Sequence, residues 1–136
     1  MPKTILVSVT ITVLALIEFF AFCMLVGSAR GRYDVKAPAV SGHPIFERYF
    51  RVQMNTLEQL MLFLPLLWIA AAYAIVAYYW LALIGVLFLI GRIIYLRSYV
   101  ADPAKRSAGF GIGALPVMAL MVIDLVGVII MWVHSP

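Results

Sequence analysis

The sequence predicts an all-α fold: a polytopic membrane protein in which four transmembrane helices form one bundle. Hydrophobic residues make up 65% of its 136 positions and charged residues only 12%, whereas a soluble domain has about 45–50% and about 25% of these. The apolar excess is too large for one soluble core, so we expect the lipid bilayer to cover much of the surface. The length leaves room for a single membrane domain, residues 1–136.

Uninterrupted apolar stretches mark the expected spans, since a helix needs about 20 such residues to cross a bilayer. The first stretch lacks the basic region and the cleavage site of a signal peptide, so we expect a retained span. Residues 59–91 carry no charge and are too many for one straight crossing, so a turn is expected near residues 74–79. The expected spans are 5–27, 45–74, 77–100 and 104–133.

The basic residues indicate how the spans are oriented. Nine of the ten Lys and Arg residues lie in or beside the first and third connections, and only Lys3 lies at the other side. The positive-inside rule therefore places both connections in the cytoplasm and both termini on the opposite side. The short connections and modest length favour a bacterial or organellar inner membrane, and we expect the bacterial inner membrane.

Metal and nucleic acid partners are not expected. Cys23 is the single cysteine, which rules out an intrachain disulfide and a cysteine-based metal site. His43 and His134 flank spans on opposite sides of the membrane, so they cannot share a metal. The basic residues border hydrocarbon rather than a solvated face, which argues against nucleic acid. The G-x-G-x-G run at residues 109–113 follows no strand, so we expect it to allow close helix packing.

A polar stripe runs along the first half of helix 45–74. It consists of Arg48, Arg51, Asn55 and Glu58, spaced by three, four and three residues, which places them within an arc of about 80° on a helix. Snorkelling explains cations at a helix end, but not Asn55 and Glu58 deeper on the same face. A stripe facing lipid would be costly, so we expect it to face other helices or a water-filled cavity.

Helix 77–100 carries a matching polar surface at the same end. Arg92, Tyr95 and Tyr99 share an arc of about 60°, and Arg106 follows just beyond this helix. Arginine binds carboxylates through two parallel hydrogen bonds, and a glutamate can pair with an ammonium group. The two surfaces together predict a pocket for a small zwitterion with several carboxylates.

Residues 47–58 read E-R-x-x-R-x-Q-x-N-x-x-E, and with this stretch the chain resembles the membrane-associated proteins in eicosanoid and glutathione metabolism, the MAPEG family. It is most similar to the branch of microsomal glutathione transferase 2-like proteins and leukotriene C4 synthase. The resemblance covers nearly the whole chain. Further family positions are matched by Ser28, Ala29, Arg30, Arg92, Tyr95, Tyr99 and Arg106.

The resemblance implies a homotrimer that binds glutathione between neighbouring subunits at the cytoplasmic face. Carboxylate-binding residues, an ammonium-binding pair and tyrosine hydroxyls for amide groups would make up the site. The neighbouring subunit would contribute Arg30 and Gln53. One subunit would contribute Arg51, Asn55, Glu58, Tyr95, Tyr99 and Arg106.

Two positions depart from the family pattern. Leukotriene C4 synthase has a second arginine after the one matching Arg30, proposed to activate the thiol, whereas this chain has Gly31 and then Arg32. A tyrosine that often follows the matching glutamate is replaced by Gln59. Arg106 is therefore our first candidate for stabilising the thiolate, followed by Arg30 and Arg32.

The expected activity is that of a membrane-bound glutathione S-transferase in detoxification, which conjugates the glutathione thiolate to lipophilic electrophiles. Glutathione peroxidase activity toward lipid hydroperoxides is expected as a second activity. A free thiol ionises near a pKa of about 8.5, and an adjacent cation lowers this value. Glutathione is the co-substrate, and no metal is required.

Two other functions fit parts of the pattern. The same fold can serve as a non-catalytic scaffold that binds lipid. A small proton-coupled multidrug exporter also has four helices and an essential glutamate in its first span, a position that Glu18 occupies. We expect Glu18 and Asp124 to pair with polar groups in the bundle or to stay protonated, because an unpaired charge inside a membrane is costly.

Overall fold

The computed structural model describes residues 1–102 and 106–135, with the backbone alone for residues 106–110. The described chain is helical throughout its four long elements, which confirms the all-α prediction. Each is long and apolar enough to cross a membrane. The helices are α1 (Lys3–Arg32), α2 (Pro44–Ala72), α3 (Tyr78–Ala101) and α4 (Arg106–His134); positions 104 and 105 of the expected fourth span lie outside the described residues.

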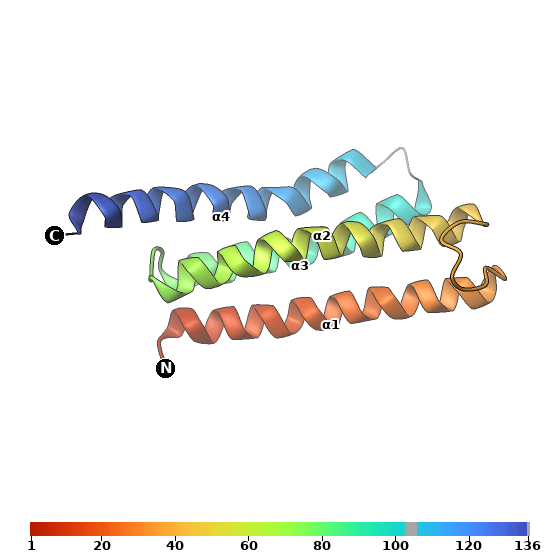
Figure 1. Cartoon of the computed structure of the whole chain (residues 1–136), viewed down its shortest axis with the longest axis horizontal. Coiled ribbons are helices and arrows are strands. Elements are labelled where there is room, and N and C mark those ends of the chain that lie inside the picture. Colours follow the sequence, from red (N-terminus) through yellow and green to blue (C-terminus); the bar gives the residue numbers. More distant parts are fainter. Residues whose placement is uncertain (103–105, 136) are drawn as a thin grey trace.

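The four helices run side by side with alternating direction (Figure 1). The helices α1 and α4 lie on opposite sides of the α2–α3 pair. Both termini and the α2–α3 turn lie at one end of the bundle, and the α1–α2 connection lies at the other. The α1–α2 connection, the end of α3 and the start of α4 therefore share one end of the molecule, together with the first half of α2.

Local capping explains where α2 begins. His43 adopts an extended backbone conformation before the helix, and its Nδ1 accepts a hydrogen bond from the Ile45 backbone N–H at 3.2 Å. Pro44 follows at the first helical position, where its missing N–H has no partner to lose. Glu47 accepts from the Gly42 backbone N–H at 3.0 Å. These contacts fix the entry of the chain into the helix that carries the polar stripe.

Close helix contacts in the bundle depend on glycine. A Cβ atom on Gly91 of α3 would lie 3.0 Å from the Gly113 Cα of α4, and one on Gly85 would lie 2.6 Å from the Ile11 side chain of α1. The close packing expected of the 109–113 glycine run is present at Gly113. It is absent at Gly111, where a Cβ would meet nothing within 4 Å of the described atoms.

Large apolar side chains cover the outer surface of the bundle. Phe20 of α1 is 65% exposed and Leu115 of α4 is 63% exposed, as are many neighbours on both helices. Such continuous apolar exposure would promote aggregation in water, but in a bilayer the lipid chains solvate it. The length and the surface of the helices are those of an integral, multi-pass membrane protein.

Candidate functional site

A polar cavity of about 620 Å³ opens at the end of the bundle that holds the α1–α2 connection. The end of that connection, the first turns of α2 and the end of α3 form its wall. Its volume is within the usual range of about 300–1,000 Å³ for small-molecule sites. The lining residues are Val40, Ser41, Pro44, Glu47, Arg48, Phe50, Arg51 and Tyr99.

Arg48 joins the start of α2 to the end of α3. Its Nη1 donates hydrogen bonds to the carbonyl oxygens of Val100, at 2.9 Å, and Ala101, at 3.3 Å. The last carbonyls of a helix have no partner within the helix, and a cation near them also interacts favourably with the helix dipole. Arg48 therefore stabilises the end of α3 and holds one wall of the cavity in place.

Three of the residues predicted from the sequence meet between α2 and α3. The Asn55 side-chain amide donates to the Tyr95 hydroxyl at 2.6 Å, and the ring centroids of Tyr95 and Tyr99 are 5.5 Å apart. Tyr95 is buried, whereas Tyr99 is half-buried and lines the cavity. The Asn55–Tyr95 contact therefore connects the polar stripe of α2 to the cavity through a pair of tyrosine rings.

The outer part of the stripe remains open in a single chain. Arg51 lines the cavity with much of its side chain exposed, and Glu58 is exposed near the middle of α2. The expectation that the stripe faces other helices is therefore met within one chain by Asn55 but not by Glu58. A carboxylate exposed on a membrane-spanning helix needs a polar partner, and the described residues of this single chain do not place one beside it.

Arg92 differs from the expectation that it would line the pocket. It is fully buried, with its Nε donating to the Thr56 hydroxyl at 3.3 Å and its Nη1 donating to Gln59 Oε1 at 3.2 Å. Its guanidinium carbon lies 4.4 Å from the centroid of the Tyr95 ring. Gln59, which replaces a tyrosine of the family pattern, thus serves as a hydrogen-bond acceptor for Arg92.

Arg30 and Gln53 make their contacts on another side of α2. Arg30 Nη1 donates to the carbonyls of Val35, at 3.1 Å, and Ala39, at 2.8 Å, in the α1–α2 connection. Gln53 donates to Cys23 Sγ of α1 at 3.6 Å, and on a helix it points about 160° away from Asn55. The structure thus does not bring Arg30 and Gln53 together with the Asn55–Tyr95 pair in one chain.

The remaining candidates for thiolate stabilisation are Arg32 and Arg106. The Arg32 side chain is exposed, with its guanidinium carbon 5.8 Å from the Tyr33 ring centroid. It lines a small cavity of about 170 Å³ beside Tyr33 and Tyr49, separate from the larger one. Arg106 begins α4, but its side chain lies outside the described residues. Among the described residues, no group of three or more His, Cys, Asp and Glu is arranged to hold a metal ion.

Comparison with known proteins decides the family. The model of the MAPEG family matches residues 8–126, which include every residue placed above. The chain belongs to the MAPEG family. The resemblance found from the polar stripe and the Arg92-x-x-Tyr95 spacing is therefore confirmed.

Relatives within the MAPEG family are similar over most of their length. The uncharacterized protein sll1147 of Synechocystis is 42% identical over 121 residues, which are 88% of this chain and 85% of that protein. Microsomal glutathione S-transferase 2 of Bos taurus is 36% identical over 120 residues, 88% of this chain and 80% of the relative. Leukotriene C4 synthase of Bos taurus is 30% identical over 120 residues, which are 88% of this chain and 79% of the relative.

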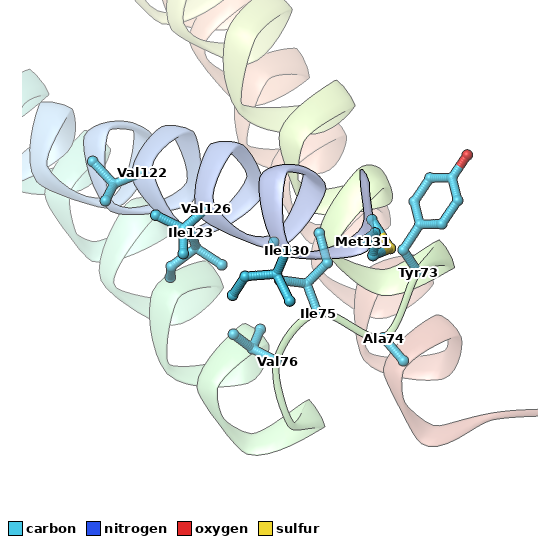
Figure 2. A pocket seen from close by; sticks show the side chains of 10 residues that line it. Tyr73, Ala74, Ile75, Val76, Val122, Ile123, Val126, Ile130 and Met131 are labelled. Carbon is cyan, nitrogen blue, oxygen red and sulfur yellow. The ribbon is translucent and has the colours of Figure 1, made fainter. Parts of the chain in front are cut away.

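A second cavity in this MAPEG chain was not predicted from the sequence. It measures about 530 Å³ and lies between the α2–α3 turn and the second half of α4, at the end of the bundle that holds the termini (Figure 2). Apolar side chains such as Ile75, Ile123 and Ile130 point into it. Its residues give no signal in the sequence, because the same side chains also suit lipid contact.

Proposed function

We propose that this chain is a membrane-bound glutathione S-transferase that conjugates the glutathione thiolate to lipophilic electrophiles in detoxification. Peroxidase activity toward lipid hydroperoxides is proposed as a second activity. The observation that carries the proposal is the Asn55–Tyr95 hydrogen bond at 2.6 Å beside a polar cavity that Arg51 lines. Similarity to a microsomal glutathione S-transferase 2 and to a leukotriene C4 synthase supports the same class of reaction.

The exposed chemistry of the cavity and the stripe fits glutathione as the co-substrate. Arg51 offers a planar pair of donors to a carboxylate, and the Glu58 carboxylate can accept from the γ-glutamyl ammonium. The Asn55 amide and the hydroxyls of Tyr95 and Tyr99 can bind the amide groups of the tripeptide. The polar lining is open at the surface of the chain, so a charged peptide can enter from the aqueous side.

We propose that the complete site lies between subunits of a homotrimer. Arg51 and Glu58 are exposed on one side of α2, and Gln53 contacts α1 on another side. A neighbouring copy that presents its Arg30 and Gln53 to the open stripe would supply the polar partner that Glu58 needs. The positive connections support a cytoplasmic position for this site, with both termini on the opposite side of a bacterial inner membrane.

A cation close to the sulfur would activate the thiol by stabilising the thiolate without giving up a proton. Arg106 is our first candidate. Arg30 is weaker, because both carbonyl contacts of its Nη1 would have to be lost or shared before it could reach a ligand. The Arg32 side chain is exposed, so it can change conformation to reach a ligand. The bilayer concentrates the apolar electrophile beside the thiolate. With an aryl halide, the sulfur attacks the carbon that carries the halogen, the thioether bond forms, the carbon–halogen bond breaks and the halide ion leaves.

The test is glutathione binding and conjugation by the full-length chain in detergent. Calorimetry measures the Kd for glutathione, and an aryl halide serves as the electrophile for the conjugation rate. We expect Arg51→Gln to weaken binding roughly tenfold, the effect of losing one hydrogen bond to a charged group. Arg97→Gln, which removes the same charge from an exposed position of α3, is the matched control. Absence of both binding and conjugation in the wild type would instead support a lipid-binding scaffold.

A further inference from the structure

Arg92 is the point at which three helices of the bundle meet. It belongs to α3, donates hydrogen bonds to Thr56 and Gln59 of α2, and lies against Gly113 of α4, where a Cβ atom would come within 2.9 Å of Nη1. No other described arginine or lysine is buried.

The guanidinium of Arg92 also forms the support beneath Tyr95. Its central carbon lies 4.4 Å from the Tyr95 ring centroid, and a cation over an aromatic face is attracted by the ring. The Tyr95 hydroxyl accepts a hydrogen bond from Asn55 of the polar stripe. The face of the Tyr95 ring therefore contacts Arg92 while its hydroxyl contacts α2. Through Thr56 and Gln59, Arg92 is itself tied to the helix that carries Asn55.

One nitrogen of Arg92, Nη2, is buried and has no hydrogen-bond partner in the described part of the chain. A buried donor without a partner is costly in a membrane protein. The guanidinium is held instead by its contacts with Thr56, Gln59 and the Tyr95 ring.

We propose that Arg92 is a positioning residue for glutathione binding, which acts by holding the Tyr95 hydroxyl against Asn55. The proposal rests on the proposed function for its ligand. Arg92 does not touch glutathione and acts through the orientation of Tyr95.

A double-variant experiment separates positioning from a general loss of structure. The Kd for glutathione is measured on Arg92→Gln, on Tyr95→Phe and on the two combined, with Arg97→Gln as the control. We expect Arg92→Gln to weaken binding roughly tenfold while the KM for the aryl halide stays unchanged. Because Arg92 acts through Tyr95, the Kd of the combined variant should be no higher than that of the single variant with the higher Kd. Additive losses, or a wild-type Kd for Arg92→Gln, would overturn the proposal.

Thermal unfolding without ligand keeps this inference distinct from the proposed function. Here Tyr95→Leu replaces Tyr95→Phe in the single and the combined variant, because phenylalanine would keep the ring that Arg92 contacts. If Arg92 supports Tyr95, the combined variant loses less Tm than the sum of the two single losses; additive Tm losses overturn the contact whatever the ligand is. If the wild type binds no glutathione while the Tm coupling persists, the proposed function fails and the Arg92–Tyr95 coupling stands.

Discussion

Replacing Gly91 by Ala tests the close contact between α3 and α4. The added Cβ would lie 3.0 Å from Gly113 Cα, 3.1 Å from Gly113 N and 3.2 Å from the Ile112 carbonyl carbon. Carbon atoms in favourable contact are about 3.5–4.0 Å apart. The contacts are therefore too short by a few tenths of an ångström or more, and the atoms concerned are backbone atoms that cannot rotate away. The two helices would have to separate over this part of their interface.

Overpacking of this kind destabilises proteins by about 1–3 kcal/mol. We expect Gly91→Ala to lower the Tm in detergent by several degrees, since each kcal/mol corresponds to roughly 2–8 °C for domains of 60–250 residues. The matched control is Gly111→Ala, because its Cβ meets nothing within 4 Å of the described atoms and alanine favours the helix by about 1 kcal/mol. If the two variants unfold at the same temperature, the helices do not approach each other as closely as described.

Three further predictions concern Arg48, Gly31 and Glu58. Arg48→Ala removes the donor for the carbonyls of Val100 and Ala101 and should lower the free energy of unfolding by about 1–3 kcal/mol. Amide hydrogen exchange should become faster in the last turn of α3. Unchanged protection of these amides would contradict this prediction. Gly31→Arg should keep the wild-type Tm, because a Cβ there meets no described atom within 4 Å. A second arginine that reaches the thiol should stabilise the thiolate, so the conjugation rate near pH 6.5 should rise. Glu58→Gln should weaken glutathione binding roughly tenfold with little effect on Tm, since its side chain is exposed; calorimetry and thermal unfolding check both parts.

The sequence was sufficient for the helices and for one contact between them. Apolar stretches long enough to cross a bilayer locate the four helices, because the bilayer requires that length. The spacing places Asn55 on a polar face of α2 and Tyr95 on a polar face of α3, and the structure joins them by a hydrogen bond. Helical periodicity reports which residues share a face, whereas the role of both residues in binding glutathione stays a prediction.

Burial and partner choice could not be predicted in the same way. Arg92 shares a 60° arc with Tyr95 and Tyr99, yet it is fully buried and its acceptors are Thr56 and Gln59. A helical arc gives the direction of a side chain but not how closely a neighbouring helix approaches it. That approach depends on Gly113 of α4, whose lack of a side chain makes room for the guanidinium.

The burial of Arg92 has a consequence for how the chain enters the membrane during synthesis. An arginine at the centre of an isolated helix raises the free energy of insertion by about 2.5–3.5 kcal/mol, and Arg92 lies well inside α3. Thr56 and Gln59 of α2 emerge from the ribosome first, and only the short turn at residues 73–77 separates the two helices. Insertion of α2 and α3 as a helical hairpin therefore lets Arg92 find its acceptors before it faces lipid, whereas α3 inserting alone would not.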